Sequence, residues 1–157
     1  MSPVAYIPRT RDLYPDYPPY RWVVNEDAPW TPLKAPLAEC KVALLSTGGI
    51  HTSDQTPFHS RDDTTYREIP RDVDFKDLCV SHFGYITDDA RADPNCVFPL
   101  ERMRELQTDG IIGELANPAY SMMGGIYSSR RVRDQLAPAI VDLLVQRKVD
   151  VLLLVPA

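Results

Sequence analysis

A pair of glycines with hydroxyl and imidazole neighbours follows the first apolar run of the chain. The segment STGGIHTSDQ occupies residues 46–55, at the end of the run 41–47. Backbone amides that glycines leave accessible, with Ser and Thr nearby, can hold an anion or a carboxylate. The candidate ligand contacts in this loop are Ser46, Thr47, Gly48, Gly49 and His51. The spacing fits neither GxGxxG nor the Walker loop, so a tight structural turn is an equal alternative.

A second glycine pair lies in SMMGGI, residues 121–126, ahead of the longest helical pattern. Its candidate contacts are Met123, Gly124 and Gly125, although methionines in such a segment are usually core residues. Two glycine loops that converge on one crevice indicate a binding site more strongly than either loop alone. We therefore expect both loops at the same edge of the sheet, near the carboxyl end of the strand 151–155.

The histidines and cysteines form no recognisable catalytic or metal-binding pattern. Cys79 and His82 are three residues apart, but no second ligand pair has a spacing typical of zinc sites, so we expect no metal. No GxSxG elbow occurs, and no cysteine lies in an activating sequence context. These residues therefore indicate no catalytic group within the chain. We include His82 with the two loops as a candidate contact to substrate or partner.

The apolar pattern predicts the strands that must position these loops. Residues 41–47 and 77–85 are expected to be strands, the second followed by a turn at Gly84. Residues 52–74 are polar and are expected to form a loop. The chain ends in VDVLLLVPA, and the Val/Leu run 151–155 is typical of a strand buried on both faces of a parallel sheet.

Two helices are expected between these strands. Residues 99–109 have helical spacing, and Gly110 is a suitable stop. The longer helix covers 128–148, with Ser129 as the candidate N-cap. Its apolar stripe consists of Val132, Leu136, Ile140, Leu143 and Leu144. Pro138 lies inside this stripe and is expected to kink or split the helix.

The element order strand, loop, strand, helix, helix, strand predicts an open α/β sheet. We expect mostly parallel, Rossmann-like or flavodoxin-like winding, with residues 38–157 forming only the N-terminal half of such a domain. Residues 1–37 hold 8 of the 15 prolines, 4 of the 8 tyrosines and both tryptophans. Proline disfavours regular helix and central strand, so we expect an extended arm that lies on its own subunit or on a partner.

Bulk properties exclude several classes of protein. The 157 residues are 44% hydrophobic and carry a net charge of -5, without the Lys/Arg cluster that a nucleic-acid binder needs. No apolar run is long enough to span a membrane, and the N-terminus does not resemble a signal peptide. Cys40, Cys79 and Cys96 show no CxxC pairing, and their odd number suggests free thiols in a reducing cytoplasm.

Four stretches of the chain resemble one enzyme family. They are VALLSTGGIHTSDQTPF, DDTTYREIPRDVDFKDLCVSHFGY, ADPNCVFPLERMREL and YSMMGGI, and the similarity runs from about residue 41 to residue 157. The family is that of the selenoprotein B subunits of glycine, sarcosine, betaine and D-proline reductases. In this family the strand that corresponds to VDVLLLVPA is followed at once by selenocysteine, or by cysteine in many relatives.

The resemblance implies reductive cleavage of a C–N bond in a small amine substrate. A pyruvoyl group on a partner subunit would hold the amine, the chalcogenide after Ala157 would attack the activated carbon, and a dithiol would resolve the adduct. This chain itself would carry no cofactor, and its glycine loops and His82 would contact substrate or partner. The implied partners are other reductase subunits or the remainder of its own subunit, in an oligomeric complex.

The end at Ala157 has three explanations under this resemblance: a UGA codon read as a stop, a deliberate truncation, or a break in the polypeptide. Two other functions stay open. One is a non-catalytic binding or assembly module, and the other is a Cys-dependent oxidoreductase that acts on another small substrate. The nucleotide sequence after the Ala157 codon separates enzyme from module, because only the enzyme needs an in-frame UGA or Cys codon followed by a long reading frame.

Overall fold

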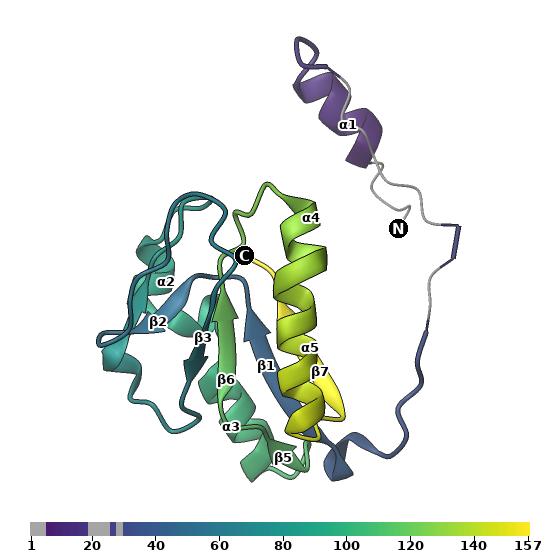
Figure 1. Cartoon of the computed structure of the whole chain (residues 1–157), viewed down its shortest axis with the longest axis vertical. Helices are drawn as coiled ribbons and strands as arrows, with labels where there is room; N and C mark the ends of the chain where they lie inside the picture. Colours follow the sequence, from purple (N-terminus) through teal and green to yellow (C-terminus); the bar gives the residue numbers. More distant parts are fainter. Residues whose placement is uncertain (1–5, 19–25, 28–29) are drawn as a thin grey trace. The chain divides into compact units, whose positions relative to one another are not determined.

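The computed structural model describes residues 6–18, 26–27 and 30–157. The chain divides into two compact units, residues 1–32 and 33–157. The second unit contains a mixed, mostly parallel open sheet with helices on both faces, as the sequence predicts (Figure 1).

The sheet is built around one central parallel strand, β1 (Lys41–Ser46). Along one edge β1 pairs with β7 (Val151–Val155), and along the other it pairs with β5 (Glu114–Leu115) and β6 (Ala119–Met122), all in parallel. β3 (Tyr66–Ile69) adds an antiparallel strand outside β6. The arrows of β1 and β6 point to the same upper edge in Figure 1, where the C-terminus also lies.

The pairing of β1 with β7 is fixed near the amino end of both strands. The backbone N–H of Lys41 donates to the Asp150 carboxylate at 2.8 Å, and the Asp150 N–H donates to the Lys41 carbonyl at 2.9 Å. The following register runs without interruption from Val42↔Val151 to Ser46↔Val155. The position of each β7 residue relative to β1 is therefore defined over the whole strand.

Two short strands leave the main sheet and form a separate ribbon. β2 (Ile50–Thr52) pairs antiparallel with β4 (Leu78–Val80), which places His51 opposite Cys79. The sequence predicted a longer strand over 77–85 and a loop over 52–74, and both predictions are wrong in part. Only three residues of the first segment are in a strand, and β3 lies inside the second segment because Tyr66–Ile69 pairs with all four residues of β6.

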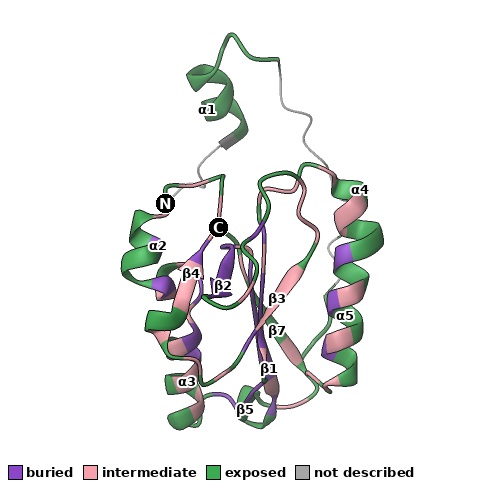
Figure 2. Ribbon diagram, turned by 60° about the vertical axis from the view of Figure 1, so that its left-hand side comes forward, coloured by how far each residue is buried: buried purple, intermediate pink, exposed green. Residues whose placement is uncertain are grey.

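Helices cover the two faces of the sheet and make three layers (Figure 2). α2 (Asp88–Ala92) and α3 (Leu100–Thr108) pack on the first face together with the ribbon, and α3 confirms the predicted helix. α4 (Ser129–Arg131) and α5 (Ala137–Gln146) cover the second face. Side chains of β1 alternate between the two cores: the first core takes Val42 and Leu44, and the second takes Ala43 and Leu45.

The long helical pattern near the C-terminus forms one continuous segment with a π-helical turn in the middle. Ser128, and not the predicted Ser129, caps it, because the Ser128 hydroxyl accepts the Arg131 N–H. The π-helix Val132–Leu136 precedes Pro138, whose ring removes one backbone donor from the helix. The wider turn keeps the helix continuous, and Leu136, Ile140 and Leu144 are buried as predicted.

The strand β7 is less buried than its composition predicts. The relative solvent exposures of Leu152, Leu153 and Leu154 are 37%, 39% and 54%. Because β7 pairs only with β1, its outer edge has no neighbouring strand among the described residues. The expectation of burial on both faces is therefore wrong for this chain, and an apolar strand edge is open to solvent.

The N-terminal unit departs from an extended arm over part of its length. Tyr6–Leu13 forms the helix α1, with Pro8 in its first turn, where the missing N–H costs no helical hydrogen bond. Residues 15–18 form a turn, and the next residues of this Pro-rich segment, 19–22, lie outside the described residues. Trp30 is 86% exposed.

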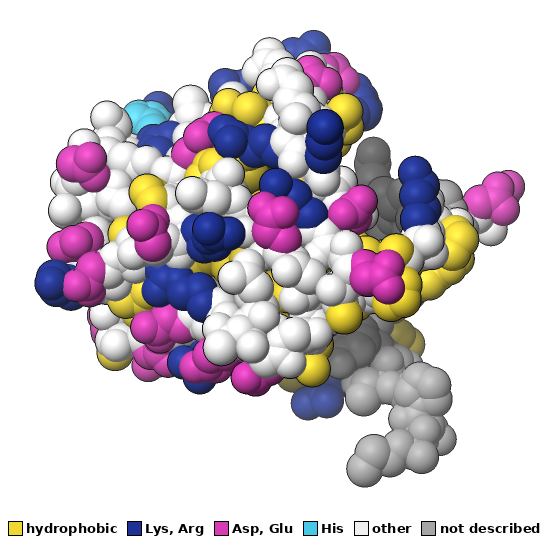
Figure 3. Space-filling model, turned by 90° about the horizontal axis from the view of Figure 1, so that it is seen from below, with side chains coloured by type: hydrophobic (Ala, Val, Ile, Leu, Met, Phe, Trp, Pro, Cys, Tyr) yellow, Lys and Arg dark blue, Asp and Glu magenta, His cyan; other side chains and the backbone are white. Residues whose placement is uncertain are grey.

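The face seen from below, at the amino ends of the parallel strands, carries acidic and basic side chains in alternation (Figure 3). One ion pair on it joins Lys41 to Glu114 across β1 and β5, at 2.9 Å. Within the described part of the chain, no helix has both the length and the apolar composition required to cross a bilayer.

Candidate active-site crevice

The two glycine loops meet at the carboxyl ends of β1, β6 and β7. Gly48 forms an antiparallel bridge with Met123, and the Gly49 N–H donates to the Met122 carbonyl at 3.1 Å. The Thr47 N–H donates to the carbonyl of Val155, at the end of β7, at 3.0 Å. The predicted placement of both loops at one edge of the sheet, beside the end of β7, is therefore confirmed.

Thr47 holds the backbone of Ala157. The Ala157 N–H donates to the Thr47 hydroxyl at 2.8 Å, and this hydroxyl donates to the backbone oxygen of Ala157 at 3.3 Å. One hydroxyl thus serves as acceptor and donor to the same residue. Any group attached to Ala157 would start from a defined point in the crevice.

Gly124 lies against this point and has no space for a side chain. A Cβ on Gly124 would lie 2.9 Å from the Ala157 oxygen, 3.0 Å from Nε2 of His82 and 3.1 Å from the Thr47 oxygen. The neighbouring Gly125 has no atom within 4 Å of the corresponding position. Gly124 is therefore required for close approach of three chain segments, whereas Gly125 has open space where a Cβ would lie.

The first glycine pair is needed for a different reason. Gly49 has a φ of +70°, and a Cβ there would lie 2.3 Å from the Ser81 carbonyl oxygen. At Gly48 the Cβ would lie 2.9 Å from the side chain of Val97. Both positions admit only glycine, and both serve the packing of β2 and of the 97–99 segment under the crevice.

Ser46 supports the loop from below. It is fully buried, its hydroxyl donates to the Val97 carbonyl at 2.6 Å, and it accepts the Gly48 N–H at 2.9 Å. Met123 is also buried, with 1% exposure, and faces the core. These two predicted contacts lie in the wall of the crevice and have no free surface toward it.

His51 is brought near the crevice by β2, but its ring is fully engaged. Its Nδ1 must donate to the Thr52 carbonyl at 2.9 Å, because a carbonyl only accepts, which leaves Nε2 to accept the Ser81 hydroxyl at 2.9 Å. The residue is 4% exposed. His51 therefore links the strands of the β2–β4 ribbon and offers no free ring atom to a ligand.

His82 is the opposite case. Its Nδ1 accepts the Gly84 N–H at 3.0 Å, so the neutral ring carries its proton on Nε2. This Nε2 is buried and has no hydrogen-bond partner. Burial lowers the pKa of His82, and the nearby Thr47 backbone opposes this shift without completing a hydrogen bond. A neutral donor thus lies beside Ala157 with its N–H unused.

Tyr85 fixes the orientation of His82, a role that no pattern in the sequence indicates. The two rings lie 4.4 Å apart between centroids, at an interplanar angle of 40°. The Tyr85 hydroxyl donates to the Gly48 carbonyl at 2.8 Å, and burial raises the pKa of this phenol. Tyr85 therefore ties the His82 loop to the first glycine loop. The only signal in the sequence is its position three residues after His82.

Loops beside the crevice expose large apolar side chains. Phe83 and Ile86 flank the turn at Gly84, and Tyr127 follows the second glycine pair. All three are largely exposed, Tyr127 to 93%. Exposed aromatic and aliphatic groups around a polar crevice are typical of a surface that contacts another protein.

The cysteines lie outside this arrangement. Cys40 is buried, Cys79 is half-buried in β4 and Cys96 is exposed, and all three are free thiols. Partial desolvation raises the pKa of the Cys96 thiol, and the negative charges of Asp93 and Asp89 raise it further. Both effects disfavour a thiolate at this position. No group of three or more His, Cys, Asp or Glu side chains among the described residues is arranged to hold a metal ion.

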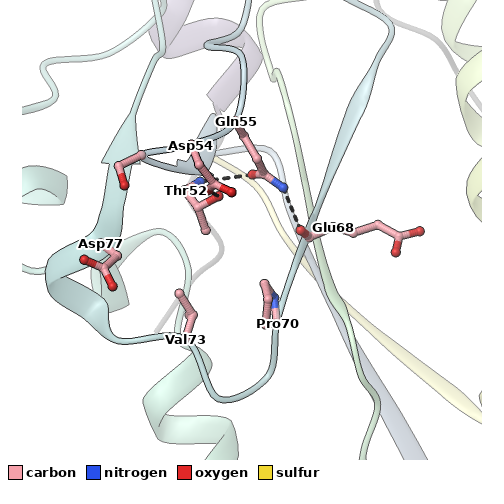
Figure 4. A pocket seen from close by; sticks show the side chains of 8 residues that line it. Thr52, Asp54, Gln55, Glu68, Pro70, Val73 and Asp77 are labelled. Atoms are coloured by element: carbon pink, nitrogen blue, oxygen red, sulfur yellow. Dashed lines mark hydrogen bonds between the residues drawn. The ribbon is translucent and has the colours of Figure 1, made fainter.

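A separate groove of about 470 Å³ lies between β3 and the β2–β4 ribbon (Figure 4). Its polar groups bond with one another: the Thr52 hydroxyl donates to Asp54 at 2.6 Å and lowers the pKa of that carboxyl, and Gln55 Nε2 donates to the Glu68 carbonyl at 2.8 Å. The Glu68 carboxylate points away from the groove, toward Arg147 at 3.3 Å. None of the predicted site residues lines it.

Comparison with known proteins gives a consistent result. The family model described as glycine/sarcosine/betaine reductase selenoprotein B matches residues 22–157. The chain is 35% identical over 125 residues to the D-proline reductase subunit gamma of Acetoanaerobium sticklandii, and the match covers 80% of this chain and 52% of that subunit.

Two further relatives are components of related complexes. The sarcosine reductase complex component B subunit beta of Peptoclostridium acidaminophilum is 33% identical, with 67% of this chain and 25% of that subunit covered. The glycine reductase complex component B subunit gamma of Symbiobacterium thermophilum is 30% identical, with 75% and 28% covered. This chain therefore spans about half the length of the first relative and about a quarter of the other two. No solved structure matches it significantly.

Proposed function

Because this chain belongs to the glycine/sarcosine/betaine reductase selenoprotein B family, we propose that it is the N-terminal part of a reductase subunit that cleaves a C–N bond. In this proposal a selenocysteine or cysteine follows Ala157 directly. The observation that supports it most is the convergence of Thr47, Gly124 and His82 on the backbone of Ala157. The crevice is thus built around the point to which the nucleophile would be attached.

The chemistry requires an ionised nucleophile and a substrate held by another subunit. The selenolate or thiolate attacks the carbon next to the substrate nitrogen, the Se–C or S–C bond forms, and the amine leaves with the electron pair and takes up a proton. A dithiol then cleaves the Se–C or S–C bond: its two electrons and a proton go to the carbon, the dithiol becomes a disulfide, and the selenolate or thiolate is regenerated. A pyruvoyl group on the partner subunit supplies the carbonyl that binds the amine.

Residues of this chain provide the setting for that step. The glycine loops let backbone atoms approach the reacting group closely, and hydrogen-bond donors held in a fixed position stabilise an anion. The exposed Phe83, Ile86 and Tyr127 form the surface against which the substrate-bearing subunit packs. Small amines of the glycine, sarcosine, betaine or D-proline class are the proposed substrates.

The open edge of β7 supports a longer subunit. Leu152–Leu154 expose apolar surface on a strand whose outer edge is unpaired among the described residues, and the relatives are much longer than the matched region. We propose that the remainder of the subunit supplies the next strand of the sheet. The exposed Val141 and Val145 of α5 would pack under the same segment.

The proposal is tested with the full-length subunit reconstituted with its partner subunits. Release of the amine from each of the four substrate classes is measured with a dithiol as reductant, and peptide mass mapping identifies the residue after Ala157. We expect activity on at least one substrate and its loss when that residue is changed to serine. If the residue after Ala157 is neither cysteine nor selenocysteine, the enzyme proposal is refuted and the assembly module is favoured.

A further inference from the structure

One side-chain donor beside Ala157, the Nε2–H of His82, makes no well-formed hydrogen bond, and an acceptor close to it in the chain is the Thr47 backbone. Nε2 of His82 is buried and unpartnered, although a buried polar group normally finds a partner. By contrast, both ring nitrogens of His51 in β2 have hydrogen-bond partners, the Thr52 carbonyl and the Ser81 hydroxyl. A donor without a well-formed hydrogen bond, beside the end of β7, indicates a partner that the described chain does not contain.

The tautomer decides which kind of partner fits. Because Nδ1 accepts the Gly84 N–H, the ring is neutral and Nε2 donates. Burial lowers the pKa of His82, which further disfavours the imidazolium. The ring therefore cannot act as a proton donor to a leaving group without losing the Gly84 hydrogen bond. It is suited to donate a hydrogen bond to an anion.

The position of Nε2 identifies the anion. A Cβ built on Gly124 would lie 3.0 Å from Nε2 and 2.9 Å from the backbone oxygen of Ala157, so both atoms lie close to Gly124. Thr47 fixes Ala157 there with two hydrogen bonds. The side chain of the next residue would thus begin within the reach of His82.

We propose that Nε2–H of His82 donates a hydrogen bond to the thiolate or selenolate of the residue that follows Ala157, and so stabilises the nucleophile in its ionised form. This inference rests on the proposed function. Tyr85 acts with it as a positioning residue, because its stacked ring and its hydrogen bond to Gly48 hold the imidazole in place. His82 would be the group that lowers the pKa of the nucleophile.

The test uses the full-length subunit with cysteine after Ala157, and it measures the thiol pKa from the pH dependence of alkylation by iodoacetamide. His82→Phe keeps a ring against Tyr85 but removes the donor, and we expect the thiol pKa to rise by about 1 to 2. His82→Gln retains an N–H donor and should give an intermediate pKa. His59→Gln, a change at an exposed histidine, is the matched control and should leave the pKa unchanged.

A second measurement separates the two possible sources of the anion, the thiolate and the carboxylate of a ligand. Alkylation is repeated with saturating acetate. One outcome would overturn the proposal: acetate protects the wild-type thiol from alkylation but does not protect it in His82→Phe, while the thiol pKa is the same in both proteins. His82 would then bind a ligand carboxylate. An unchanged thiol pKa in His82→Phe and His82→Gln, with unaltered circular dichroism, also overturns it. Both results leave the proposed reductase function intact.

Discussion

The hydroxyl of Thr47 bonds to both backbone polar atoms of Ala157, accepting from its nitrogen at 2.8 Å and donating to its oxygen at 3.3 Å. Thr47 itself is fixed by its N–H to the Val155 carbonyl. Two hydrogen bonds thereby join the first glycine loop to the residue two positions beyond the end of β7. This anchoring positions whatever side chain comes next.

Replacing Thr47 by valine should release the end of β7. Valine has nearly the same shape but no hydroxyl, so both hydrogen bonds to Ala157 are lost, at a cost of about 1 kcal/mol in the free energy of unfolding. Urea unfolding measures this change. Thr47→Ser retains the hydroxyl and should stay within a few tenths of a kcal/mol of the wild type. Equal losses in both variants would contradict the role of the hydroxyl.

The two glycines of the second loop should respond differently to alanine. Gly124→Ala places a Cβ within 3.1 Å of three polar atoms, including Nε2 of His82, and should destabilise the protein by about 1 to 3 kcal/mol. Gly125→Ala meets no atom within 4 Å and should be close to neutral. Thermal unfolding of both variants checks the contrast. Similar melting temperatures would show that the crevice is looser than the structure indicates.

A charge on the open edge of β7 should prevent completion of the sheet. Leu154 is 54% exposed, so Leu154→Lys should barely change the stability of this chain, yet it should abolish pairing with a following strand. Co-purification with the remainder of the subunit, expressed as a separate polypeptide, measures this. Ile111→Lys is the matched control, because Ile111 is 53% exposed near the opposite edge of the sheet. Retention of the partner by Leu154→Lys would rule out this edge.

Stability should depend on pH through His82. Its pKa in the folded protein is lower than the ordinary value of about 6.5, so the unfolded chain binds a proton where the folded chain does not. The free energy of unfolding should therefore be highest above about pH 6.5, and it should fall as the pH drops toward the folded pKa. Carboxyl groups titrate at lower pH and are separable from this effect.

His82→Gln should reduce the slope of that stability profile between about pH 5 and 7, because glutamine does not titrate. Chemical denaturation at a series of pH values measures the slope. The same slope in the wild type and in His82→Gln would mean that another group titrates.

Regular apolar patterns made part of the fold predictable. β1, α3 and the helix that ends in α5 follow runs or stripes that only one element type satisfies. β3 and β6 are four residues each, and their pairing joins segments about fifty residues apart, so no local pattern specifies them. Exposure of β7 was not predictable either, because a Val/Leu composition is typical of a buried strand and does not indicate a position at the edge of the described sheet.

The candidate site was predictable as a location but not as a set of contacts. Glycine pairs after or before core elements indicated the correct edge of the sheet. The sequence treats His51 and His82 alike, and only hydrogen-bond geometry separates a saturated ring from a ring with a free donor. Tyr85 was missed because stacking between loops leaves no periodic signal.

The hydrogen bonds at the two ends of the β1–β7 pair also constrain how the gene can change. Asp150 bonds to Lys41 at one end and Thr47 to Ala157 at the other, so both strands must keep a fixed number of residues between these ends. A deletion in one strand would shift its register by one residue and turn its core side chains to the wrong face. Segments 41–47 and 150–157 should therefore keep a constant length during evolution.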